Sequence, residues 1–166
     1  MKQITKQILV LIATFFKVGY LPLMPGTWAS LVTAVLVYFI KPYWDAPLYI
    51  QIPIIVIIFI LGIPAASEAE KHFKLLKKTD KHFSEKDPRP CVIDEVAGQM
   101  VALLMVPHDK IYLYAAAFVL FRVFDVFKPP PVSTAEKLPG GLGIMVDDIV
   151  AGLYAFGILQ LYIHII

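Results

Sequence analysis

The sequence predicts an all-α membrane protein, a single domain over residues 1–166 in which about four helices cross or partly cross the bilayer. The composition is the first observation, because the chain is 58% hydrophobic and only 17% charged, with a mean hydropathy of +0.72, far above a soluble globular domain. The second observation is that long uncharged runs recur along the chain. The third is that the charged residues gather in the few segments between those runs.

Two of the uncharged runs have the length of a membrane span. Crossing the hydrocarbon takes about 20 helical residues, and the runs at 46–67 and 149–166 come close to that length. The runs at 96–107 and 111–121 are too short alone, so they would cross only by extending into charged flanks. A further helix is expected from about Ala29. The N-terminal stretch lacks a small-x-small cleavage site and is expected to remain as an amphipathic or interfacial lead-in.

Alternating helix direction places three charged segments on one side of the membrane: 17–28, 68–95 and 122–148. The opposite turns carry only two basic residues, Lys41 and Lys110. By the positive-inside rule the charged side faces the cytoplasm. Segment 68–87 is expected to form an amphipathic helix or a solvated loop, and most of the basic residues lie in or next to it: Lys71, Lys74, Lys77, Lys78, Lys81, Lys86 and Arg89.

Several classes of protein are disfavoured by what the chain contains. A formal charge of +2, scattered along the sequence, argues against nucleic acid as a partner. A single cysteine, Cys91, excludes an internal disulfide framework and a cysteine-rich zinc site. The four histidines are scattered, which argues against histidine-based phosphatase chemistry.

Paired acids occur at two places beside apolar segments. Asp94 and Glu95 stand in DPRPCVIDEVAGQ where an apolar helix begins, and Asp147 and Asp148 are expected to open the last helix in LPGGLGIMVDDIVAGLYA. Either pair could simply cap a helix, or it could hold a divalent cation. Gly98 would let another helix approach closely.

A third polar group lies in FRVFDVFKPPP. Arg122, Asp125 and Lys128 follow each other at three-residue spacing, so on a helix they form a polar fan about 120° wide, and the three prolines should end that helix. One interpretation is structural, an Arg–Asp ion pair with the lysine reaching the headgroups. The other is a site that binds an anion and a metal.

Two turns could approach an anion. In GYLPLMPGTWASL, Gly26 and Thr27 lie at a turn before a helix whose N-terminus is free for a phosphate, although a plain turn capped by Thr27 explains the same residues. The loop that contains Gly141 is glycine-rich and can approach a ligand closely.

The combination of acids, bases and helix N-termini on one face fits a phosphate bound with Mg²⁺. Cys91 is not followed by an arginine six residues later, and no D-x-D-x-T segment offers an aspartyl nucleophile. The chemistry that remains is metal-assisted attack of water on a phosphate monoester, with Asp94 or Asp125 positioning or deprotonating the water. Arg122 and Lys128 would hold the phosphate oxygens.

Four motifs in this order resemble the phosphatidylglycerophosphatase A family of bacterial membrane enzymes, over about residues 19–157. They are MPGT at 24–27, IDEVAG at 93–98, FRVFDVFKPPP at 121–131, and GGLGIMVDDIVAG from Gly140 onward. The resemblance implies a hydrolase that removes the terminal phosphate of phosphatidylglycerophosphate with Mg²⁺. It also implies a multi-pass protein of the bacterial cytoplasmic membrane whose active site faces the cytoplasm.

By matched position, the family's motifs fall on most of the candidate residues, and we assign the acids to the metal and the bases to the phosphate. Asp94 and Asp125 are the candidate catalytic residues. The expected metal ligands are Asp94, Glu95, Asp125, Asp147 and Asp148, and the expected phosphate-binding residues are Arg122, Lys128, Gly26, Thr27 and Gly141.

Two other functions compete with this hypothesis. A non-enzymatic membrane protein that binds phosphate or an anionic lipid, or a small transporter component, would line a pathway with its acids, but here the spans are nearly uncharged. Alcohol phosphotransfer from a nucleotide-linked lipid needs a D-G-x-x-A-R pattern that the chain lacks. The number of metal ions, the route of the acyl chains and the oligomeric state stay open.

Overall fold

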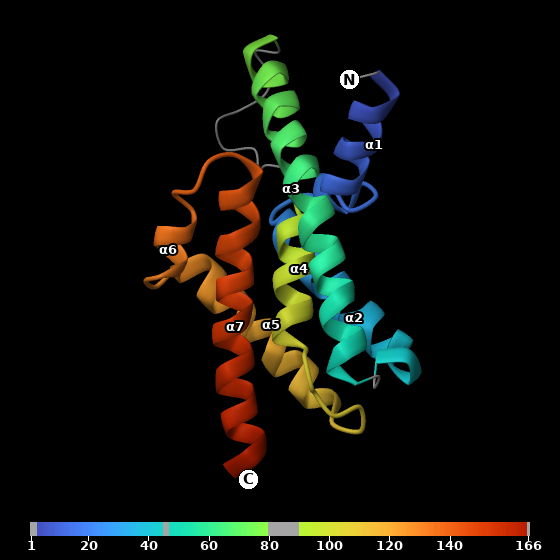
Figure 1. The fold of residues 1–166 in the computed structure, drawn as a ribbon, viewed down its shortest axis with the longest axis vertical. Helices are drawn as coiled ribbons and strands as arrows, with labels where there is room; N and C mark the ends of the chain where they lie inside the picture. The colour runs from blue at the N-terminus through green and yellow to red at the C-terminus, as the bar shows by residue number, and fades with distance from the viewer. Residues whose placement is uncertain (1–2, 45–46, 80–89, 166) are drawn as a thin grey trace.

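The computed structural model describes residues 3–44, 47–79 and 90–165. Within that part the chain is all-α, with no strand, which confirms the predicted class (Figure 1). Lys81, Lys86, Asp87 and Arg89 lie outside the described residues. The elements are α1 (Gln3–Ala13), the 3-10 turn η1 (Val18–Tyr20), α2 (Pro25–Trp44), α3 (Leu48–Thr79), α4 (Ile93–Ala102), α5 (Ile111–Phe127), α6 (Val132–Ala135) and α7 (Gly141–Ile165).

Two of these helices, α3 and α7, are long and apolar enough to cross a membrane. They contain the two runs that the sequence predicted as ordinary spans, although α3 continues well past the apolar run, to Thr79. Only 22% of the most apolar window of α3 is buried, and large side chains such as Ile57 and Ile60 are more than half exposed. Such a surface suits contact with lipid and indicates membrane association.

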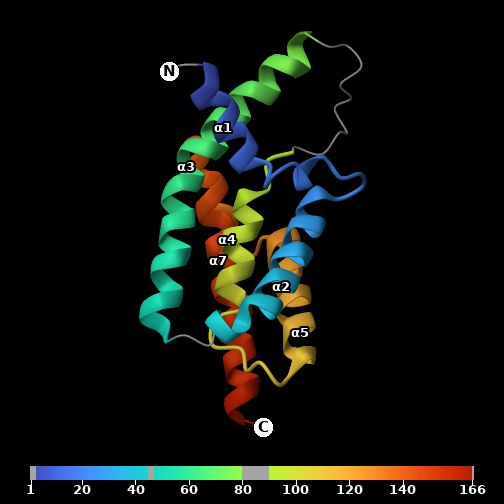
Figure 2. The same cartoon turned by 90° about the vertical axis from the view of Figure 1, so that its right-hand side faces the viewer.

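Helix α4 lies at the centre of the bundle. It packs against α2, α3 and α7, and Figure 2 shows it between α3 on one side and α2 on the other. Every residue of α4 except Asp94 and Glu95 is buried. The core around it includes Leu103, Phe121 and Met145, which come from three different parts of the chain. The first turn of α4 is therefore held in place from several directions.

Two glycines let α4 and α7 approach closely. A Cβ atom on Gly98 would overlap the backbone oxygen of Asp148 and the ring of Phe121, and a Cβ on Gly152 would overlap the backbone oxygen of Gly98. The close approach expected at Gly98 is thus confirmed. Its consequence is that the acids of α4 and α7 come next to each other.

Three helix boundaries place functional residues. Helix α5 ends at Phe127 and Lys128 takes a left-handed conformation (φ 44°), so the proline run ends the helix as predicted. Helix α2 begins at Pro25, four residues before the expected start, because proline is favoured in the first turn of a helix. Helix α7 begins at Gly141, so Asp147 and Asp148 do not open it as expected but lie about two turns inside it.

Candidate active site

A cavity of about 360 Å³ lies where the first turns of α2 and α4 meet the C-terminal end of α5 and the first part of α7. Charged and apolar residues both line it, and many come from the motifs singled out in the sequence. The lining residues are Leu23, Met24, Pro25, Gly26, Cys91, Asp94, Glu95, Arg122, Asp125, Lys128, Glu136, Ile144 and Asp148.

Three carboxylates form an acidic cluster in this cavity. Asp94, Glu95 and Asp148 each offer an oxygen within 4.8 Å of the other two. One oxygen on each, Oδ1 of Asp94, Oε2 of Glu95 and Oδ2 of Asp148, is buried without a hydrogen-bond partner in the part of the chain described. Carboxylates this close together repel each other, and their buried oxygens lose their hydration. A hard divalent cation would offset both costs, and carboxylate oxygens are the ligands it prefers, so the cluster fits such an ion.

Arg122 and Asp125 from α5 face the same cavity. Nη1 of Arg122 lies 2.6 Å from Oδ2 of Asp125, and both side chains are mostly buried. The Nε atom of Arg122 is buried and has no hydrogen-bond partner among the described residues. The i,i+3 ion pair that the sequence suggested is therefore present, but it lines a cavity instead of an open surface. Part of the guanidinium remains free to bind an anion there.

Lys128 holds two carboxylates at the edge of the cavity. Its Nζ donates to Oδ2 of Asp147 at 2.7 Å and lies 3.2 Å from Oε1 of Glu136. Burial lowers the pKa of Lys128, but the hydrogen bond and charge of Asp147, together with Glu136, outweigh burial and hold that pKa above its ordinary value. The ammonium is therefore charged at neutral pH.

Asp147 does not join the acidic cluster. It is buried, accepts from Lys128 and also accepts from the backbone N–H of Asp148 at 3.1 Å. Neighbouring residues on a helix point about 100° apart, so Asp148 can face Asp94 and Glu95 while Asp147 faces Lys128. The structure thus gives the two adjacent acids different partners.

Of the three residues expected at anion-binding turns, only Gly26 lines the cavity. A Cβ on Gly26 would overlap Oε1 of Glu95, so the α2 backbone reaches the acidic cluster. The backbone N–H of Thr27 donates to the oxygen of Met24 at 3.0 Å. The N–H of Gly141 donates to Oγ of Ser67 at 2.9 Å. Both N–H groups thus donate hydrogen bonds within the protein, and neither residue lines the cavity.

Several residues that line the cavity were not predicted from the sequence as site residues. Glu136 follows the short helix α6 and carries no recognisable spacing to the other acids. Cys91 lies three residues before Asp94, and this closeness in the sequence was the only indication that it lines the cavity. Burial, and then the charges of Asp94 and Glu95, raise the pKa of the Cys91 thiol well above its ordinary value. A protonated thiol is a poor nucleophile, in line with the absence of a cysteine-phosphatase motif.

The chain matches a family model described as phosphatidylglycerophosphatase A over residues 11–163. A Bacteroides thetaiotaomicron protein named "Putative phosphatidylinositol-3-phosphatase" is 38% identical over 152 residues, which cover 89% of this chain and 88% of the relative. An Escherichia coli protein named phosphatidylglycerophosphatase A is 32% identical over 155 residues, 93% of this chain and 83% of the relative. A Haemophilus influenzae protein of the same name is 32% identical over 146 residues, 87% and 82% of the two chains. No solved structure matches the chain.

Proposed function

This chain belongs to the phosphatidylglycerophosphatase A family of lipid phosphatases, and on that premise we propose that it hydrolyses the terminal phosphate monoester of phosphatidylglycerophosphate, with Mg²⁺, to phosphatidylglycerol and inorganic phosphate. The observation that carries the proposal is the arrangement of one cavity. It brings the acidic cluster of Asp94, Glu95 and Asp148 together with the cationic side chains of Arg122 and Lys128.

The acidic cluster would hold the cation. Its three buried, unpartnered oxygens supply hard ligands on two helices that pack closely. The chemistry that Mg²⁺ supplies in such a site, when bound, is neutralisation of the negative charge on the phosphate. The hypothesis from sequence also assigned Asp125 and Asp147 to the metal. Because Asp125 pairs with Arg122 and Asp147 with Lys128, we now assign these two acids to other roles.

Arg122 and Lys128 would bind the phosphate oxygens. The free Nε of Arg122 and the ammonium of Lys128 lie on the cavity wall, and a phosphate there would accept charge-assisted hydrogen bonds from both. The backbone at Gly26 would lie close to the same group. Thr27 and Gly141 drop out of this assignment, since their N–H groups bond within the protein.

Asp125 is our candidate general base. It lines the cavity outside the acidic cluster, and its carboxylate can accept the proton of an attacking water. The water oxygen forms a bond to phosphorus while the bond from phosphorus to the glycerol oxygen breaks. The water proton passes to Asp125, which later returns it to the solvent, and the glycerol oxygen takes up a proton from solvent water as it leaves as an alcohol. Asp94, which the sequence offered as the other candidate base, is better placed as a metal ligand.

Phosphatidylinositol 3-phosphate is a second candidate substrate. The relative from Bacteroides thetaiotaomicron is named for a phosphatidylinositol-3-phosphatase activity. That substrate is also a phosphate monoester on a lipid headgroup, so the same acids and bases could serve it. The two substrates differ in the alcohol that leaves, which is a glycerol in one and an inositol ring in the other.

We also propose that the protein is a multi-pass protein of the bacterial cytoplasmic membrane with this cavity on the cytoplasmic side. The cavity is lined by the first part of α7, a helix that begins where Gly141 bonds to Ser67, the point at which α3 turns from apolar to charged. An excess of lysine marks the cytoplasmic side of a membrane protein. Besides α3 and α7, helices α2 and α5 would then cross or partly cross the bilayer.

The test is phosphate release by the purified protein in lipid nanodiscs. We expect release from phosphatidylglycerophosphate with Mg²⁺, slower release from phosphatidylinositol 3-phosphate, and none from either lipid after chelation. Faster release from the inositol lipid would replace the proposed substrate. Failure to release phosphate from both lipids, by folded protein with Mg²⁺, would overturn the proposed activity.

Replacing Asp125 tests the role of the base. Asp125→Asn keeps the volume but removes the proton acceptor, so we expect turnover to fall by roughly 10²- to 10⁴-fold. The matched control is Asp109→Asn, which changes an exposed acid in the turn between α4 and α5. Because Asp125→Asn also takes the ion-pair partner from Arg122, thermal unfolding of both variants is measured and turnover is compared at a temperature where both are folded. If Asp125→Asn retained full turnover, this carboxylate would have no catalytic role.

A further inference from the structure

A second cavity, of about 980 Å³, lies between α1, the turn η1 and the charged part of α3. It shares no lining residue with the first cavity. The elements that form it, α1 and the C-terminal part of α3, extend together from one end of the bundle (Figure 1). The residues that line it are Gln3, Lys6, Gln7, Val10, Leu11, Thr14, Lys17, Tyr20, Glu68, Lys71, His72 and Leu75.

The charges of this second cavity favour an anion. Three lysines, Lys6, Lys17 and Lys71, face one acid, Glu68. Nζ of Lys6 lies 3.7 Å from Oε1 of Glu68, so that acid is already engaged. Lys17 and Lys71 have no carboxylate within ion-pair distance in the described part of the chain. Two ammonium groups are therefore available on its wall.

The same cavity has an apolar side. Val10, Leu11 and Leu75 line it. On α1, Ile4, Ile8 and Leu11 recur at i, i+4 and i+7 and are exposed, Ile4 by 69%. The other apolar residues of α1 pack on a small cluster around Ala69 and Phe73 of α3. A short helix with lysine beside an uncovered apolar stripe has the character of a helix that lies in a membrane interface.

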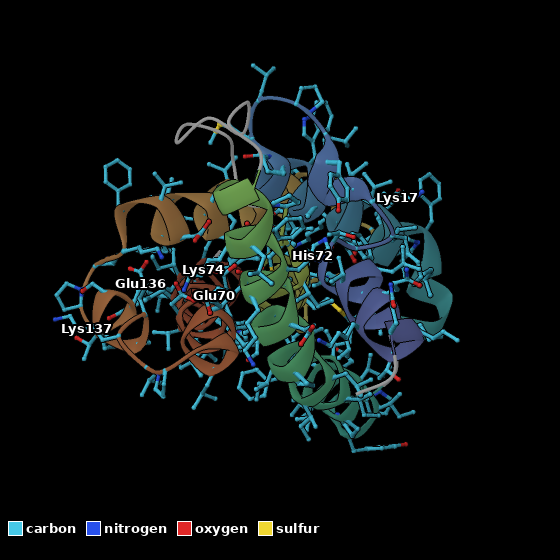
Figure 3. All side chains as sticks on the ribbon, turned by 90° about the horizontal axis from the view of Figure 1, so that it is seen from above. Lys17, Glu70, His72, Lys74, Glu136 and Lys137 are labelled. Carbon is cyan, nitrogen blue, oxygen red and sulfur yellow. The ribbon has the colours of Figure 1, made fainter. Side chains whose placement is uncertain are left out.

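The depth of the cavity fits the headgroup layer. The apolar run of α3 ends at Ser67, and the lining residues of α3 begin immediately after it, at Glu68. Figure 3 looks down on this end of the bundle: His72 and Lys17 lie toward α1, whereas Glu70 and Lys74 lie on the other side of α3. The unpaired lysines thus stand where lipid phosphates are found once α3 spans the bilayer.

We propose that this second cavity binds the phosphodiester headgroup of an anionic membrane phospholipid. Lys17 and Lys71 hold the phosphate, and the upper acyl chains lie against Leu11 and Leu75. The lipid is a ligand here and undergoes no reaction. The proposal rests on the charge and the apolar side of this cavity, and it does not depend on hydrolysis in the other one.

Bound lipid would stabilise the packing of α1 against the bundle, next to the active site. The backbone N–H of Val92 donates to the oxygen of Ala13 at 2.8 Å, and a Cβ on Gly19 would overlap the oxygen of Pro90. The end of α1 and the turn η1 therefore contact the segment that leads into Asp94. Loosening of α1 should be visible in the exchange of its backbone amides.

The experiment is hydrogen exchange of α1 in nanodiscs with Mg²⁺ held constant. Discs of phosphatidylcholine alone are compared with discs that contain phosphatidylglycerol, a phosphodiester lipid. We expect the amides of α1 to exchange on the order of tenfold more slowly with the anionic lipid. The double variant Lys17→Gln/Lys71→Gln should lose that protection, whereas Lys74→Gln/Lys137→Gln, which removes the same charge elsewhere, should keep it.

Three results would overturn the proposal. The first is equal protection in neutral and anionic discs, and the second is full protection in the Lys17→Gln/Lys71→Gln variant. The third is protection by inorganic phosphate in phosphatidylcholine discs, because the ligand would then be a free anion and not a lipid. Since exchange is measured without turnover, none of these results bears on the proposed hydrolysis.

Discussion

At the scale of single residues, Lys128 joins two carboxylates that differ sharply in their surroundings. Asp147 is buried, whereas the side chain of Glu136 is 58% exposed and also lines the cavity. A phosphate that enters the cavity competes with the exposed partner more easily than with the buried one. Asp147 is therefore suited to position the lysine, and Glu136 to occupy it while no phosphate is bound.

Replacing Glu136 should strengthen substrate binding. In Glu136→Gln the ammonium of Lys128 loses the partner that competes with the phosphate, and an acid that repels the substrate disappears. We expect KM for phosphatidylglycerophosphate to fall roughly two- to fivefold, the size of an exposed ion pair, with little change in kcat. Steady-state kinetics in mixed micelles measures both constants.

The control for this prediction is Glu70→Gln. Glu70 also pairs with a lysine, Lys74, at 2.6 Å, but it lies outside both cavities. KM should not change in that variant. A KM that stays the same or rises in Glu136→Gln would show that Glu136 does not compete with the phosphate.

At the scale of helices, the site depends on how closely α4 and α7 pack. Gly98 and Gly152 allow that contact, and Asp148 lies one turn before Gly152. An added methyl group at the contact must push the helices apart, and overpacking of this kind costs typically about 1–3 kcal/mol. It would also separate Asp148 from Asp94 and Glu95.

Two substitutions in α7 test this packing. Gly152→Ala should lower the thermal stability and raise the Mg²⁺ concentration needed for half-maximal phosphate release. Gly157→Ala, five residues along the same helix, has nothing within 4 Å of the added atom. It should be neutral or stabilise by roughly 0.5–1 kcal/mol, because alanine favours a helix. Equal effects of the two substitutions would mean that the close contact does not matter.

The sequence predicted the helices better than their ends. The apolar runs predicted the two long apolar helices and the proline run predicted the end of α5, because they reflect local hydrophobicity and local chain geometry. The start of α7 was missed by several residues because it depends on Gly141 bonding to Ser67, 74 residues earlier. Periodicity along the chain carries no information about such a distant partner.

For the candidate site, too, the sequence predicted the types of the residues but not which of them contact each other. The motifs identified the acids and bases, and the structure brings most of them to one cavity. The sequence could not separate Asp147 from Asp148, because only the positions of α4 and Lys128 decide which acid faces which partner. Glu136 was missed because its role depends on where the chain after α6 folds back.

At the scale of the whole molecule, the proposed orientation can be tested with single cysteines. In a Cys91→Ser background, Asp109→Cys lies in the turn between α4 and α5, and Lys137→Cys lies between α6 and α7. A maleimide that cannot cross membranes should label Asp109→Cys in intact cells and Lys137→Cys only after the cells are opened. The reverse pattern would place the candidate active site on the outer face.

The proposed function needs a divalent cation at the acidic cluster, and the affinity for Mn²⁺ tests this most directly. Mn²⁺ can replace Mg²⁺ at oxygen ligands, and electron paramagnetic resonance measures its binding in the purified protein without turnover. Asp148→Asn removes a cluster ligand, so its Kd should rise at least about tenfold, while Asp147→Asn, beside Lys128, should change Kd less than about twofold. Equal effects of the two variants, or the larger effect in Asp147→Asn, would contradict the account.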